Sequence, residues 1–172
     1  MVLKFFNTLT NKKEEFKEIN EGEVKIYTCG PTVYNYAHIG NWRSFIFADL
    51  LRRYLKYKGY DVNHVMNLTD VDDKTIRDSK INNMTLKQFT EKYTKFFFED
   101  MDTLNIERVE QYPKATDSIK EMVNITKKLI DKGIAYKSDD GSVYYSVSKF
   151  DGYGKLSKIK FKDLKAGARV KH

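Results

Sequence analysis

One stretch of the sequence decides the fold: Glu23-Val24-Lys25-Ile26-Tyr27-Thr28-Cys29-Gly30-Pro31. Its first six residues alternate between polar and apolar side chains, which is typical of a β-strand with one buried face. Gly30 and Pro31 then break regular structure. The sequence therefore predicts a first strand over residues 23–28, followed by a loop that begins at Cys29.

A helix and a second strand follow this loop. Large apolar side chains recur every three or four positions from Trp42 to Lys58, which predicts a helix, and Gly59 ends it. Residues 60–68 alternate again and predict a second strand. A strand, a helix and a strand at this spacing form a βαβ unit, in which the strands are parallel and the crossover is right-handed.

The remainder of the chain predicts two more helices and a hairpin. Thr85 and Gln88 have capping-box spacing at the start of a helix that continues to about Leu104. A third helix is predicted over residues 116–132. Two short apolar runs around a polar turn then predict a β-hairpin over residues 134–147, and the Lys-rich remainder is typical of a surface loop.

The composition restricts the class of protein. The chain has 172 residues, 12 Tyr and 11 Phe, which indicates a folded core rather than a disordered tail. Its formal net charge of +7 favours a polyanionic partner, although positive charge also keeps proteins soluble. The single cysteine excludes an internal disulfide framework and favours a reducing, cytoplasmic compartment. Neither a signal peptide nor a membrane-spanning apolar run is evident.

A short polar motif lies between the first strand and the first helix. His38 and Gly40 fall at the carboxyl edge of the predicted parallel strands, where ligands bind in open α/β sheets. A helix amino terminus offers backbone N–H groups to a phosphate, and glycine lets a ligand approach the backbone. The motif therefore predicts an ATP phosphate site. A lone motif of this kind is also compatible with a loop histidine and a turn glycine.

Longer motifs surround this site and carry a resemblance to a known family. Residues 29–41, with their Cys-Gly-Pro-Thr-Val-Tyr and His-Ile-Gly-Asn runs, and residues 67–74, Asn-Leu-Thr-Asp-Val-Asp-Asp-Lys, resemble the signature pair of the cysteinyl-tRNA synthetases, which are class I aminoacyl-tRNA synthetases. Supporting stretches lie at residues 6–10, 113–116 and 167–170. The resemblance covers essentially the whole chain, which is similar to the amino-terminal part of such an enzyme.

The resemblance implies a fold and a domain organisation. The fold is α/β, with the first half of a Rossmann-like parallel-sheet catalytic domain over residues 1–115. Residues 116–172 are expected to form part of a small α+β inserted, connective subdomain. The second catalytic half, a Lys-Met-Ser-Lys-Ser-type loop and the tRNA-binding region are expected outside this chain, so the chain is expected to be a truncated piece of the enzyme.

Cys29 matches the family's first zinc ligand, and the resemblance implies that the zinc takes the thiolate of the substrate cysteine. Zn²⁺ favours and stabilises thiolate, so a metal bond can reject serine. The other candidate ligands in the chain, His38, His64 and His172, do not complete the site, and the remaining ligands are expected beyond it. An isolated cysteine is alternatively a small buried apolar residue.

The resemblance also assigns roles to residues that bind the two small substrates. His38 and Asn41 are expected to be catalytic, although Asn41 departs from the superfamily's His-Ile-Gly-His form and carries no charge. Residues 69–74 have an alternative role as a strand-ending turn and helix cap. Tyr34, Tyr36 and Trp42 are predicted to be core or pocket wall rather than base-stacking residues. The expected binding residues are His38, Gly40 and Asn41 for ATP, and Gly30, Thr32 and Thr69 for cysteine.

The function implied is activation of cysteine by Mg-ATP to cysteinyl adenylate, followed by transfer to tRNA(Cys). The whole enzyme is expected to be a cytoplasmic monomer that needs zinc, and this chain alone is expected to be inactive. Two alternatives stay open. One is a cysteine ligase of the mycothiol type, which uses the same adenylate chemistry. The other is a non-catalytic RNA-binding fragment, favoured by the basic charge.

Overall fold

The computed structural model describes residues 2–158 and arranges them in two compact units. One unit is formed by Glu18–Glu121, and the other contains residues 2–17 together with residues 122–158. The supporting motif at residues 167–170 and the candidate ligand His172 lie outside the described residues. Within the described part, no helix is long and apolar enough to cross a bilayer.

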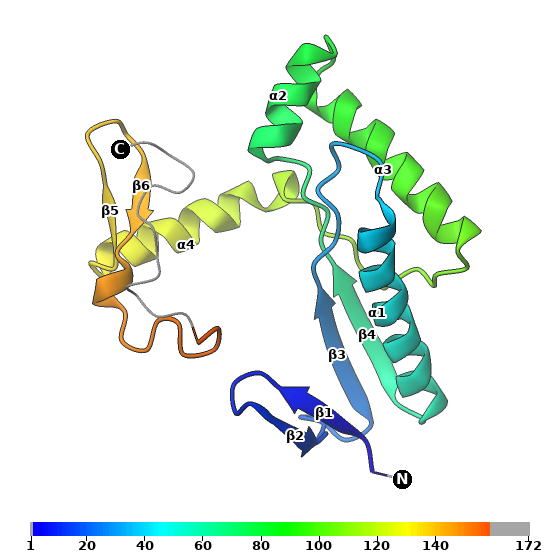
Figure 1. Cartoon of the computed structure of the whole chain (residues 1–172). Helices are drawn as coiled ribbons and strands as arrows, with labels where there is room; N and C mark the ends of the chain where they lie inside the picture. The colour runs from blue at the N-terminus through cyan, green and yellow to red at the C-terminus, as the bar shows by residue number, and fades with distance from the viewer. Residues whose placement is uncertain (1, 159–172) are drawn as a thin grey trace. The chain divides into compact units, whose positions relative to one another are not determined.

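The unit 18–121 contains the predicted βαβ arrangement (Figure 1). Strand β3 (Glu23–Thr28) is followed by helix α1 (Ile39–Tyr57) and strand β4 (Asp61–Met66). β3 and β4 pair in parallel. The prediction of two parallel strands joined by a helix is therefore confirmed, with α1 starting three residues earlier than expected.

Further parallel contacts extend this pair of strands. Thr32 and Thr69 form a bridge beyond the ends of β3 and β4. On the other side of β4, Val65 bridges to Gln111 and Leu68 to Lys114, both in parallel. Residues 111–114 therefore run parallel to β4 along its free edge, as an irregular extended segment that we call the edge segment. This segment was not predicted from the sequence.

A core of large apolar side chains joins α1 to helix α3 (Leu86–Thr103). The rings of Trp42 and Phe97 are stacked, with their centroids 5.4 Å apart, and Phe45 meets Phe97 edge to face. The helical spacing of apolar residues in α1 brings Trp42 and Phe45 to one face, where both are buried. This core holds α1 in place, and with it the loop between β3 and α1.

One short helix of this unit was not predicted. Helix α2 (Asp73–Ile81) begins after Asp72, whose carboxylate accepts the N–H of Lys74. The helix-cap interpretation of residues 69–74 is thus confirmed for Asp72, but the helix itself was missed. Helix α3 begins as predicted, with reciprocal hydrogen bonds between Thr85 and Gln88.

The other unit contains two small hairpins. β1 (Lys4–Asn7) pairs antiparallel with β2 (Lys12–Glu15), a hairpin that the sequence analysis missed. The predicted second hairpin is confirmed as β5 (Ala135–Lys137) paired with β6 (Val143–Tyr145). The predicted third helix is found as η1 (Thr116–Ser118), in the unit 18–121, followed directly by α4 (Ile119–Asp131), which runs from that unit into this one. η2 (Val147–Lys149) follows β6.

The observed architecture is α/β, with three small two-stranded sheets in the described part of the chain. It agrees with the predicted fold class at this level. The predicted division between residues 115 and 116, the larger Rossmann-like sheet and the connective subdomain stay predictions.

Candidate active site

A cleft of about 480 Å³ opens at the carboxyl end of β3 and the amino end of α1. It is lined by five of the predicted site residues: Cys29, Gly30, Thr32, His38 and Asn41. The other two, Gly40 and Thr69, do not line the cleft but contact residues that do. The loop that the sequence analysis singled out is thus one wall of a cavity large enough for a small ligand.

His38 caps helix α1 with its side chain. The Nδ1 atom of His38 accepts the N–H of Gly40 at 3.0 Å, while the Oδ1 atom of Asn41 accepts the N–H of His38 at 3.2 Å. These two bonds form a reciprocal capping box. Because Nδ1 is an acceptor, the neutral imidazole carries its proton on Nε2 and presents that atom as a donor.

The first turn of α1 offers fewer free amides than the sequence analysis expected. Imidazole occupies the N–H of Gly40, and the N–H of Asn41 donates to the carbonyl of His38. The helix dipole still places positive potential here. The side chains of this motif, His38 Nε2 and Asn41 Nδ2, rather than the backbone amides of Gly40 and Asn41, are therefore the groups that can donate to a ligand.

Glycine at position 40 follows from the position of the imidazole. A Cβ atom on Gly40 would lie 2.8 Å from Cε1 of His38 and 3.0 Å from its Nδ1. Neither distance is compatible with normal packing, so a larger residue would displace the ring. Gly40 therefore acts on the site through the orientation of His38.

Thr32 and Thr69 face each other where the two parallel segments continue past β3 and β4. The N–H of Val33 donates to the carbonyl of Thr69 at 3.2 Å, and the N–H of Thr69 donates to the carbonyl of Pro31 at 3.0 Å. These backbone bonds fix the spacing between the two signature motifs. The structure thus brings together the residues that the resemblance assigns to cysteine binding.

Cys29 is exposed and lines the cleft. Among residues 2–158 no group of three or more His, Cys, Asp or Glu side chains could hold a metal ion. His64 is buried elsewhere, with its Nε2 atom 2.8 Å from Oγ1 of Thr28. Zinc takes three or four protein ligands, whereas the described residues supply one cysteine at the cleft. They therefore do not form a zinc site by themselves.

Residues 15–172 match the family model described as the class I tRNA synthetase (C) catalytic domain. The chain belongs to the class I cysteinyl-tRNA synthetase family. It is 55% identical over 169 residues to a cysteine–tRNA ligase of Methanosarcina mazei, covering 98% of this chain and 36% of that protein. A cysteine–tRNA ligase of Leptospira interrogans is 53% identical over 167 residues, covering 97% of this chain and 35% of the relative.

These comparisons confirm the resemblance inferred from the two signature motifs. The chain spans about a third of the length of the curated relatives that it matches. It therefore aligns with one part of these longer relatives.

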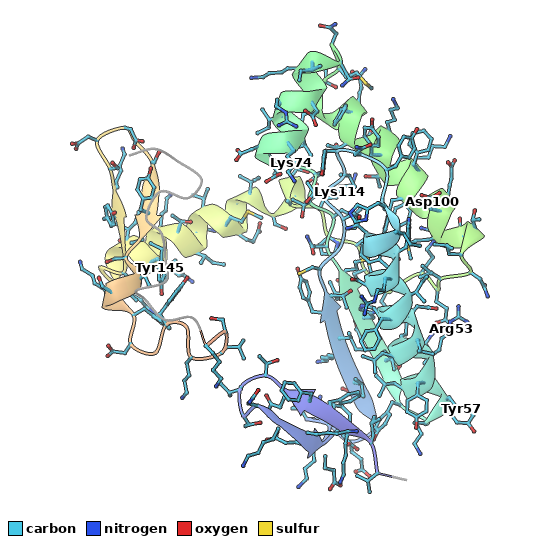
Figure 2. The ribbon with its side chains drawn as sticks, in the orientation of Figure 1. Arg53, Tyr57, Lys74, Asp100, Lys114 and Tyr145 are labelled. Atoms are coloured by element: carbon cyan, nitrogen blue, oxygen red, sulfur yellow. The ribbon has the colours of Figure 1, made fainter. Side chains whose placement is uncertain are left out.

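Within this synthetase cleft the sequence analysis missed one cation. Lys74 lines the cleft from the first turn of α2, with its Nζ atom 4.8 Å from the centroid of the Tyr34 ring (Figure 2). Lys74 is the last residue of the second signature motif, so the sequence places it near the cleft, but it does not show that its side chain lines the cleft. Tyr34 and Tyr36 line the cleft and Trp42 is in the core, which confirms the prediction for these aromatic residues.

A network of ion pairs connects α1 to residues 107–110, which directly precede the edge segment. Buried Arg52 makes a bidentate pair with Glu110, and Glu110 also accepts the backbone N–H of His64 at 2.7 Å. The bonds from Arg52, and secondarily the bond from His64, lower the pKa of Glu110 to about 2. Burial lowers the pKa of His64, and the charge of Arg52 adds to this effect; both favour the neutral form of its imidazole.

Proposed function

We propose that this chain supplies the cysteine- and ATP-binding part of a cysteine–tRNA ligase. The whole protein would activate cysteine with Mg-ATP and transfer it to tRNA(Cys). The observation that supports this most strongly is that one cleft is lined by residues of both assigned groups, Cys29, Gly30 and Thr32 together with His38 and Asn41.

The proposed first step is attack by the carboxylate of cysteine on the α-phosphate of ATP, which forms cysteinyl adenylate and releases pyrophosphate. The role of the protein is to position the two reactants and to stabilise the charge that develops on the phosphate. His38 Nε2 is the proposed donor to phosphate, and Asn41 holds the histidine backbone. Gly30, Thr32 and Thr69 form the proposed cysteine pocket.

Cys29 is the proposed contribution of this chain to a zinc site. When bound, zinc would stabilise a substrate thiolate. A single thiolate does not hold the metal, so the proposal requires further protein ligands outside the described residues. No step of the proposed reaction is derived through the metal.

The fold proposal completes this functional assignment. The first strands of a Rossmann-like sheet would be β3, β4 and the edge segment at residues 111–114, within a catalytic half over residues 1–115. Residues 116–172 would belong to an inserted connective subdomain. The whole protein is proposed to be a monomer and to be cytoplasmic, since a role in protein synthesis suits the cytoplasm.

Charging of a tRNA(Cys) transcript with labelled cysteine tests this function on the protein expressed from its full reading frame. We expect cysteine-dependent charging, and no charging with serine. Adenylate formation without charging would instead support a cysteine ligase of the mycothiol type. Salt-sensitive RNA binding without any cysteine-dependent ATP chemistry would support the RNA-binding alternative.

A further inference from the structure

Asn67 follows β4 directly, and its side chain makes three hydrogen bonds. Its Oδ1 atom accepts the N–H of Gly30 at 3.0 Å and the hydroxyl of Tyr27 at 2.9 Å, while its Nδ2 atom donates to Oγ1 of Thr69 at 3.0 Å. The backbone N–H of Gly30 can only donate, which fixes the orientation of the amide group. One side chain thus connects two of the residues assigned to the cysteine pocket.

The backbone of Asn67 also lies against Gly30, in the loop that follows β3. A Cβ atom on Gly30 would lie 1.8 Å from the carbonyl oxygen of Asn67, so no other residue fits at position 30 without a backbone shift. One residue before Cys29, Thr28 is bonded to His64 of β4. Both neighbours of Cys29 are therefore held by side chains that come from β4 or from the residue after it.

We propose that Asn67 is a positioning residue for the substrate cysteine. It holds the Gly30 amide and the Thr69 hydroxyl at a fixed spacing, although it does not itself line the cleft. Without this amide, the ends of β3 and β4 keep their backbone pairing but lose the side-chain connection between the two signature motifs. This assignment rests on the proposed function, because it concerns the same cleft.

The test is steady-state ATP–pyrophosphate exchange by the protein expressed from its full reading frame, with the variant Asn67→Ala. Two lost hydrogen bonds to pocket residues are expected to raise the KM for cysteine about tenfold. The KM for ATP is expected to stay unchanged, because His38, Gly40 and Asn41 make no hydrogen bond to Asn67. A purely structural role would change both KM values together.

Two further variants keep the test decisive. Asn63→Ala removes an exposed asparagine from β4, the strand that precedes Asn67, and is expected to change neither KM. Asn67→Asp is the second variant, in case the alanine variant does not fold. It keeps both acceptor contacts, but it can meet the Thr69 hydroxyl only by accepting its proton, which is then unavailable to the substrate. It is therefore expected to raise only the KM for cysteine.

The possible failures are distinguishable. Absence of exchange by the wild-type protein would contradict the proposed function and this assignment with it. Wild-type exchange together with an unchanged cysteine KM in Asn67→Ala and Asn67→Asp would overturn the role of Asn67 alone. An equal rise of both KM values would do the same.

Discussion

At position 40 two requirements act in opposite directions. Glycine is the poorest helix former apart from proline, and Gly40 lies in the first turn of α1. A side chain there, however, would meet the imidazole of His38 at 2.8 Å. Helix stability and the orientation of His38 can therefore be separated by a single substitution.

For Gly40→Ala we expect the affinity for ATP to fall about tenfold, because displacement of a positioned donor weakens its contact with phosphate. The thermal unfolding temperature is expected to change little, because the gain from alanine in the helix is offset by the loss of the His38 cap. ATP titrations and thermal unfolding of the same preparation check both effects. Unchanged ATP affinity would contradict the assigned role of His38.

The residues of the site differ in how far the sequence predicts them. Cys29, His38 and Gly40 lie in contiguous motifs, so their proximity follows from local sequence. The function of Asn67 depends on the parallel register of β3 and β4, which brings it opposite Gly30 across 37 positions of sequence. Sequence spacing does not report such a register, and the three bonds of Asn67 were therefore not predictable.

At the scale of elements, the start of α3 is stabilised by side chains that the sequence identifies. The hydroxyl of Thr85 accepts the N–H of Gln88 at 3.2 Å, and Gln88 Oε1 accepts the N–H of Thr85 at 3.1 Å. Thr103 ends the same helix, and its hydroxyl only donates back to the carbonyl of Glu99. The two threonines therefore provide a matched comparison.

We expect Thr85→Ala to lower the free energy of unfolding by about 1 kcal/mol, the usual contribution of an N-cap side chain. Thr103→Ala is expected to have almost no effect, since the hydroxyl there satisfies no unpaired amide. Urea denaturation of both variants measures the difference. Equal destabilisation would contradict a specific role for the capping box.

The ion pair between Arg52 and Glu110 connects α1 to the residues that directly precede the edge segment at 111–114. The pKa of Glu110 is lowered to about 2 from an ordinary value of 4.5, so the folded state binds its proton less readily than the unfolded state. The stabilisation by this carboxylate is therefore fully present above pH 4.5. It is lost as the pH falls toward 2.

For Glu110→Gln we expect a loss of about 2 kcal/mol in the free energy of unfolding at pH 6, less than for a fully buried pair because Glu110 is partly exposed. The difference from wild type should shrink as the pH is lowered from 4.5. Glu99→Gln, which removes an exposed pair with Lys95, is the control and should change little. Urea titrations across this pH range check the prediction, and a difference independent of pH would contradict it.

At the scale of the whole molecule, hydrophobic periodicity predicted the elements that have it. The βαβ unit, α3 and the second hairpin were found from such patterns. The hairpin of β1 and β2 was missed because Lys12–Glu15 is entirely charged. Helix α2 is short and mostly polar. The edge segment at residues 111–114 was missed because it contains Pro113. Proline has no N–H, so Pro113 only accepts a hydrogen bond, from the N–H of Leu68.

The incomplete zinc site and the partial coverage of the relatives lead to a prediction about activity. The described cleft is lined by one cysteine, and the chain spans about a third of the length of its curated relatives. We therefore expect the 172-residue chain alone to lack activity that the protein from the full reading frame possesses. Both proteins can be prepared and compared under the same conditions.

The measurement that tests the central claim most directly is cysteine-dependent ATP–pyrophosphate exchange by the full-length protein with added zinc, with serine as the control amino acid and the 172-residue chain assayed beside it. We expect exchange with cysteine, none with serine, and none by the shorter chain. Exchange that does not depend on cysteine, or no exchange by the full-length protein, would contradict the assignment of this cleft to cysteine activation.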